Sequence, residues 1–268
     1  MSILKYSLFA LASVAFAQWP DFAAKPVPMK DGKPDMSAPA PRTAWNTPDL
    51  SGLWENSRGA RPGEPAFSVG PPLASFANVG AGMKGGLPFQ PWAAELLKER
   101  RYNNSKNNPD ARCLPMGMMQ YHLHPQPRKI IQTPELILLI YEANAGLRQI
   151  FLDGRPLPGP DAEPWWYGYS VGHWEGDTLV VETVRHHDMG WLDIWGSPLT
   201  KDGKITERYR RTSYGLLEID VTIDDPTAYT APFTVRVNQR IMPNAELIEF
   251  VCAENDKFTS YLQGAGDK

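Results

Sequence analysis

Apolar and polar residues alternate along much of the second half of the chain. Every odd position from Leu217 to Ile223 is apolar and the residues between these positions are polar, which predicts a strand with one buried and one solvated face. Short β-branched or apolar segments separated by turn residues predict further strands. They lie at 51–56, 129–133, 136–142, 148–153, 169–175, 178–184, 205–212, 233–242 and 246–254.

The connections between these strands are short and contain no helical pattern. Gly176-Asp177, between two of the segments, predicts a tight hairpin. About nine or ten mainly antiparallel strands predict an all-β fold. A closed or nearly closed meander barrel is the simplest arrangement because closure removes the sheet edges, and a β-sandwich is the alternative.

The first half of the chain is less regular. Pro91 and a helical spacing of apolar residues predict a helix over 91–103. Residues 18–48 are rich in proline and predict an extended arm. Residues 58–90 predict a long loop, whose glycine-rich run lacks the strand and helix that flank a phosphate-binding loop. We therefore expect one β-barrel domain over 49–268.

The N-terminus has the pattern of a cleavable signal peptide over residues 1–17. Lys5 precedes an apolar run that is too short to span a bilayer, and Ala15-Phe16-Ala17 forms the small-residue cleavage pattern. The sequence therefore predicts export to the periplasm or the medium, with no membrane insertion after cleavage. The net charge of −3 and the lack of a basic stripe argue against a nucleic-acid partner.

The chain has two cysteines, Cys113 and Cys252. In an oxidising compartment such a pair is expected to form a disulfide, and two buried free thiols are the alternative.

Several motifs resemble those of an abundant family of exported bacterial proteins. The resemblance covers about residues 48–255 and implies a lipocalin-like barrel; most members are uncharacterised. The motifs are PDLSGLW at 48–54, CLPxG at 113–117, IQTP at 131–134, WEGDTLVVET at 174–183, WLD at 191–193, ERY at 207–209, DPxxYT at 225–230 and CxEN at 252–255. The chain departs from the family at 185–188, where members often have GFND, and near 197–199, where many have a histidine.

A cluster of polar residues in 185–211 is the first candidate site. A histidine near a carboxylate can hold a proton near neutral pH, as acid–base catalysis requires. The connection 185–204 joins two consecutive strands, so its ends should lie side by side. The predicted catalytic residues are His187, Asp188, Asp193, Glu207 and Tyr209.

The strand at 205–212 has two polar faces. Glu207, Tyr209 and Arg211 share one face, and Thr206, Arg208 and Arg210 share the other. One of them must point into a closed barrel. An inward row would give a polar patch in an apolar cavity, as in many binding sites, whereas an ion-paired outer face is the alternative.

Histidines and tryptophans supply the remaining candidates. His122 and His124 would share a face in an extended segment, and rings such as those of the tryptophans can stack on an aromatic compound or a sugar. The predicted substrate-binding residues are Trp165, Trp166, Trp191, Arg211, His122 and His124. A divalent metal at His122, His124, His186, His187 and Asp188 is a further alternative, although their spacing matches no established metal motif; the main expectation includes no cofactor.

Three functions follow from these patterns. The chain is predicted to be an exported enzyme that uses acid–base chemistry, of lyase, isomerase or hydrolase type, on a small aromatic or carbohydrate compound. A non-catalytic protein that binds such a ligand is the first alternative. A structural or interaction module of the cell envelope is the second.

Overall fold

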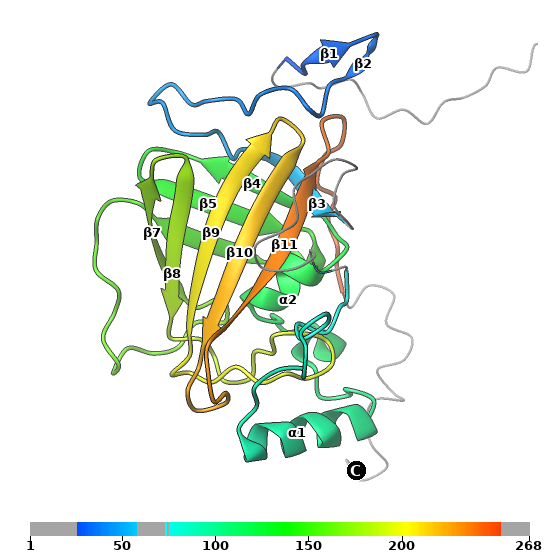
Figure 1. The fold of residues 1–268 in the computed structure, drawn as a ribbon, viewed down its shortest axis with the longest axis vertical. Helices are drawn as coiled ribbons and strands as arrows, with labels where there is room; N and C mark the ends of the chain where they lie inside the picture. Colours follow the sequence, from blue (N-terminus) through cyan, green and yellow to red (C-terminus); the bar gives the residue numbers. More distant parts are fainter. Residues whose placement is uncertain (1–25, 58–72, 74, 253–268) are drawn as a thin grey trace, which may run out of the picture.

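The computed structural model describes residues 26–57, 73 and 75–252 (Figure 1). The predicted signal peptide and residues 58–72 and 74 of the predicted long loop lie outside this part of the chain. Among the described residues, no helix has the length and apolar character that a membrane crossing needs.

Nine strands form one closed barrel, which confirms the predicted lipocalin-like all-β fold. Each strand pairs with the next one along the chain, and β11 closes the barrel by pairing with β3. The strands are β3 (Gly52–Ser57), β4 (Arg128–Gln132), β5 (Leu136–Tyr141), β6 (Leu147–Phe151), β7 (Tyr169–Glu175), β8 (Thr178–Val184), β9 (Lys204–Ser213), β10 (Leu216–Asp224) and β11 (Phe233–Ile241).

One pair in the barrel is parallel. β6 and β7 pair through Ile150↔Ser170 and Phe151↔Val171, whereas every other barrel pair is antiparallel. The segment 152–168 therefore returns the chain to the end of the barrel where β6 began. The expected hairpin at Gly176 joins β7 to β8, and Gly176 takes the positive φ of 58° that such a turn requires.

The predicted strand at 246–254 is wrong for the residues that the structure describes. Residues 243–252 follow β11 without forming a strand. The physical reason is the closure of the barrel, because β11 already pairs with β10 on one side and β3 on the other. No edge is left for a tenth strand.

The predicted helix forms α1 (Pro91–Tyr102). Pro91 occupies the first turn, and Arg100 and Arg101 lie in the last turn, where positive charge favours the helix dipole. Figure 1 shows α1 at one end of the barrel. Its Trp92 donates a hydrogen bond to the carbonyl oxygen of Thr227, in the β10–β11 connection, over 2.8 Å.

A second helix, α2 (Met118–Leu123), was not predicted from the sequence. All six of its residues are buried, so the segment lacks the polar face that reveals a surface helix. Gly117 precedes it with φ of 89°, and a Cβ there would lie 3.4 Å from Cα of Gly190. Two short 3₁₀ helices are also present: η1 (Pro109–Arg112) precedes α2, and η2 (Ala143–Ala145) lies between β5 and β6.

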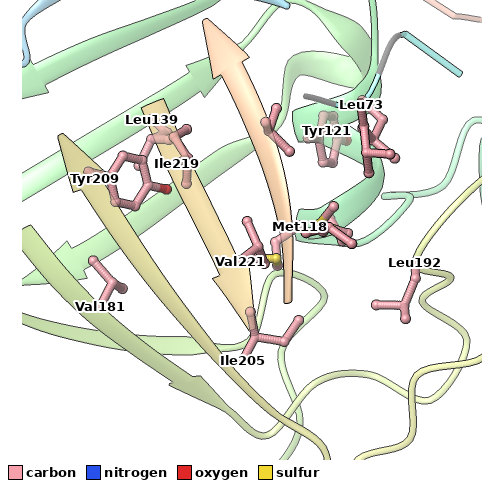
Figure 2. Packing of buried hydrophobic residues seen from close by; sticks show 14 of the residues in the cluster. Leu73, Met118, Tyr121, Leu139, Val181, Leu192, Ile205, Tyr209, Ile219 and Val221 are labelled. Atoms are coloured by element: carbon pink, nitrogen blue, oxygen red, sulfur yellow. The ribbon is translucent and has the colours of Figure 1, made fainter. Parts of the chain in front are cut away.

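The core lies inside the barrel and continues around α2. Figure 2 shows Leu139, Val181, Ile219 and Val221 from the strands in the same cluster as Met118 and Tyr121 from α2. Burial of aliphatic side chains such as these is the main stabilising contribution. Tyr209 also lies in this cluster and is almost fully buried, so its hydroxyl needs a polar partner inside the barrel.

The structure describes the proline-rich arm from residue 26 onward. The arm forms the two short strands β1 (Met29–Lys30) and β2 (Lys33–Pro34) and then crosses the barrel end opposite α1 (Figure 1). The amide groups of Tyr214 and Gly215 donate to the carbonyl oxygens of Ala38 and Met36. The arm is thus anchored to the β9–β10 turn.

Cys113 and Cys252 form the predicted disulfide, with their Cα atoms 5.6 Å apart. The bond joins the segment after η1 to the irregular segment after β11, which are 139 residues apart in sequence. It holds residues 243–252, which form no strand, against the segment after η1.

We expect the double variant Cys113→Ser/Cys252→Ser to lose about 4–5 kcal/mol of unfolding free energy, because the unfolded chain regains the freedom that closing so long a loop removes. Denaturant unfolding should show this loss, and wild type treated with reductant should match the variant. Equal stability of the oxidised protein and the variant would contradict the prediction.

Candidate functional site

Glu207 lies at the centre of a polar cluster inside the barrel. The burial pattern of β9 turns Glu207, Tyr209 and Arg211 inward, which decides between the two polar faces of this strand. The Glu207 side chain is fully buried. Tyr209 donates a hydrogen bond of 2.6 Å to Oε1 of Glu207, and the Nε2 atom of His122 lies 2.7 Å from the same oxygen.

Arg148 on β6 supplies the opposite charge. Its Nη1 donates to Oε1 of Glu207 over 3.1 Å, and its Nη2 donates to Oε2. Nη2 also donates to Thr183 over 2.9 Å, and Nε donates to Ser170 over 3.1 Å. A buried ion pair is stable only when hydrogen bonds satisfy its remaining donors and acceptors, and here side chains of β7, β8, β9 and α2 provide them.

The ion pair sets the protonation of Glu207. Burial acts to raise the pKa of Glu207, but the charge of Arg148 and the hydrogen bonds from His122 and Arg148 outweigh burial and hold this pKa well below its usual range. The carboxylate is therefore ionised and can only accept hydrogen bonds.

The state of His122 follows from its neighbour. Because ionised Glu207 cannot donate, Nε2 of His122 carries the proton of their 2.7 Å hydrogen bond. Burial lowers the pKa of His122, against the opposing effect of Glu207, so the imidazole is neutral near pH 7. A neutral ring protonated at Nε2 leaves Nδ1 as a bare acceptor.

Two buried atoms of this cluster are incompletely paired. Among the described residues, Nδ1 of His122 has no hydrogen-bond partner, and the hydroxyl proton of Tyr141 has no acceptor, although the Arg148 side chain interacts with the same hydroxyl. Burial raises the pKa of Tyr141 to about 12, although the nearby Arg148 charge acts to lower it, so the hydroxyl keeps its proton. Buried polar atoms are rarely left unpaired, and such atoms indicate a place for a bound molecule or water.

Arg128 on β4 holds α2 in position. It is fully buried and donates to the carbonyl oxygens of His124 and Gln126 over 2.9 and 3.0 Å, and to that of His122 over 3.3 Å. It also bonds Oε1 of Gln239 on β11 over 2.5 Å. These bonds fasten the C-terminal end of α2 to two strands, and thereby fix the His122 ring beside Glu207.

The structure does not bring all of the predicted catalytic residues together. Glu207 and Tyr209 contact each other inside the barrel. His187 instead stacks on Trp166, with ring centres 4.2 Å apart, and accepts a hydrogen bond from the amide of Met189. Asp188 is exposed and lines a pocket of about 340 Å³ between the 185–203 connection and α1. The hydrogen bonds and ion pairs of His187, Asp188 and Asp193 within the described chain go to other groups than Glu207.

Asp193 is buried and organises the connection. Its carboxylate accepts five hydrogen bonds of 2.9 to 3.1 Å. They come from the backbone amides of Val79, Trp195, Gly196 and Ser197 and from the hydroxyl of Ser197. These hydrogen bonds stabilise the conformation of the 185–203 connection, because each of them holds a backbone amide or a loop side chain in place.

The two histidines at 122 and 124 do not share one face. The expectation of an extended segment is wrong, because His122 lies in α2 and His124 follows its last turn. His124 packs edge-on against Phe76, and its Nε2 lies 3.8 Å from a carboxylate oxygen of Asp110. Among the described residues, no three His, Cys, Asp or Glu side chains gather as a metal ion requires.

The other predicted binding residues lie in separate places. Trp165 is partly exposed and packs on Tyr169. Trp191 is buried beneath the guanidinium of Arg100, 4.3 Å from the ring centre, and lines the same pocket as Asp188. Arg211 lies near the C-terminal end of β9, close to the N-terminal arm and far from the 185–203 connection.

Sequence reasoning missed Arg148, Arg128 and Tyr141. A signal was present in β6, where Arg148 and Ile150 alternate with exposed residues and share the inward face. An arginine in such a position predicts a buried charge that needs an acid. The sequence does not show which acid, because Arg148 and Glu207 are 59 residues apart.

Comparisons with known proteins add no assignment to this site. The chain matches no family model, and no curated protein matches it significantly.

The buried histidines predict that acid destabilises the fold. Burial, reinforced by the charge of Arg148, lowers the pKa of His186 from 6.5 to about 4. The unfolded chain therefore binds more protons than the folded one between these pH values, and stability falls as pH falls through this window. For His186 the loss is on the order of 3 kcal/mol. Urea unfolding from pH 7 to pH 4 should show it. His186→Gln should flatten the slope and the exposed His173→Gln should not; an unchanged slope in His186→Gln would contradict the prediction.

Removal of one partner of the buried ion pair should be costly. Arg148→Met leaves the Glu207 carboxylate without its counter-charge, and we expect a loss of about 3–5 kcal/mol in unfolding free energy. Arg208→Met, which breaks the surface pair with Glu175, should cost about 0–1 kcal/mol. The combined variant Arg148→Met/Glu207→Leu should recover part of the loss. A loss in Arg148→Met no larger than in Arg208→Met would disprove the role of this pair.

Proposed function

We propose that this protein is an exported enzyme of the periplasm or the medium that moves a proton on a small aromatic or carbohydrate compound, with His122 as the base. One observation carries the proposal: the bare, buried Nδ1 of His122, in a ring whose other nitrogen is held by Glu207. The proposal keeps the acid–base chemistry expected from the sequence and moves its centre from His187 to His122.

Glu207 acts as the partner of His122. When Nδ1 takes a proton from a substrate, the ring becomes an imidazolium, and the ionised carboxylate at 2.7 Å from Nε2 stabilises the new charge. Arg148 and Tyr209 hold this carboxylate in place through their own hydrogen bonds. Tyr141 keeps its proton, which has no acceptor among the described residues and can be donated in a hydrogen bond to the substrate.

A contribution to stability does not by itself explain why a barrel interior contains such a charged cluster. Replacement of buried ion pairs by apolar side chains of similar volume often leaves a protein as stable or more stable. Perturbed ionisable groups in a buried polar cluster are frequent at functional sites. The cluster is closed to solvent here, so turnover requires a segment at one barrel end to move.

A non-catalytic binding protein is the second candidate. The saturated hydrogen bonding of Glu207 favours it, because a carboxylate with its acceptors in use is a rigid structural anchor. In that case Nδ1 of His122 and the hydroxyl of Tyr141 would bind a ligand without proton transfer.

The first measurement is the tautomer of His122. Nitrogen-15 shifts should show Nε2 protonated and Nδ1 bare at pH 7, and a bound compound should shift Nδ1. A panel of small aromatic and sugar compounds should then be screened by this shift and by proton exchange with D₂O. On a compound that wild type turns over, His122→Gln and Glu207→Gln should lose about 10²–10⁴-fold in rate.

Matched controls separate this effect from general damage. His173→Gln and Glu182→Gln change the same residue types on the outer surface, where Glu182 pairs with Lys204, and both should keep full activity. If His122→Gln folds and keeps full turnover, the assignment of the base is wrong. Compounds that shift Nδ1 without turnover would favour the binding protein.

A further inference from the structure

A second pocket lies at the end of the barrel that the N-terminal arm crosses. It has a volume of about 350 Å³ and lies where β3, β4 and the end of β11 meet. Leu53, Ile130, Ile131 and Ile241 contribute an apolar lining. We call it the mouth pocket. Its size and apolar character are those of sites for small molecules.

Arg211 is one of the charged residues that line the mouth pocket, with Asp49, Lys129 and Glu246. Its guanidinium lies over the rings of Trp54 and Tyr214, at 4.9 and 5.4 Å from their centres, which holds it in one orientation. Nε donates to the carbonyl oxygen of Ser213, Nη1 to that of Asp49 and Nη2 to that of Tyr214. A guanidinium has five N–H donors, so two remain for a ligand.

The guanidinium of Arg211 lies near one carboxylate, that of Asp49, which also lines the mouth pocket. Its hydrogen bonds within the described chain all go to neutral carbonyl oxygens. Burial lowers its pKa to about 10, and the nearby Asp49 carboxylate offsets this effect only in part. The other basic group on the lining, Lys129, already pairs with Glu246 at 3.0 Å. The lining thus carries two bases and two acids, and Arg211 is the base whose N–H groups are not all used by the described chain.

We infer that the mouth pocket binds a small carboxylate with an apolar body, whose carboxylate accepts the two remaining N–H groups of Arg211. The planar fork of a guanidinium matches a carboxylate in two parallel hydrogen bonds. The apolar wall of β3, β4 and β11 then covers the rest of the molecule. This site is separate from the His122–Glu207 cluster and does not depend on the function proposed for it.

Benzoate is a suitable probe, with benzamide as its neutral counterpart of the same shape. Isothermal titration of the full mature protein should show saturable binding of benzoate, and benzamide should bind roughly tenfold more weakly because it loses the charge-assisted pair. Arg211→Met should reduce the affinity for benzoate to that for benzamide.

Three further variants keep the test independent of the folding of Arg211→Met. Ile131→Trp adds bulk to a partly exposed wall of the mouth pocket and should abolish binding, whereas Leu147→Trp, at an exposed position on β6, should leave it unchanged. Glu207→Gln should also bind benzoate normally. The inference is overturned if benzoate does not saturate, if benzamide binds equally well, or if Ile131→Trp still binds. Loss of binding in a Glu207→Gln variant that keeps the folded circular dichroism spectrum of wild type would overturn it too, since the probe would then occupy the barrel interior.

Discussion

The pairing of Glu207 with Arg148 is the interaction on which the barrel interior depends. The two side chains are fully buried and come from β9 and β6. Each is bonded further, Glu207 to His122 of α2 and Arg148 to Ser170 and Thr183 of β7 and β8. One ion pair therefore connects four strands and a helix across the barrel. Loss of either charge would leave the other alone in an apolar medium, where its burial is very unfavourable.

The helix α2 converts this pair into a site. Without α2, Glu207 would be a structural anion neutralised by an arginine. The bonds from Arg128 to the last carbonyl groups of α2 hold the helix so that the His122 ring contacts the carboxylate. The cationic guanidinium also suits the negative end of the helix dipole. Arg128 thus positions His122, the proposed base, beside the carboxylate whose charge Arg148 stabilises.

The two ends of the barrel are closed by different means, and each has its own pocket. At one end, Asp193 organises the 185–203 connection, which lies against α1 and leaves the pocket lined by Asp188 and Trp191. At the other, the N-terminal arm bonds the β9–β10 turn, and the mouth pocket contains Arg211. Glu207, Tyr209 and Arg211 lie in one inward row of β9, so a single strand supplies both the interior cluster and the base of the mouth pocket.

The sequence by itself determined the strands, α1 and the class of fold, because the two-residue period of a strand and the proline at a helix start are local properties. It also indicated the disulfide from the inferred compartment. Only the tertiary structure decided which face of β9 is inside, that α2 is a helix, and that residues 246–252 are not a strand. Periodicity cannot identify a six-residue helix that is buried on all sides, and barrel closure depends on strand pairing over the whole domain. The contact of His122 with Glu207 joins residues 85 positions apart. A buried carboxylate needs bases and hydrogen-bond donors beside it, and the fold of the whole barrel decides which residues these are.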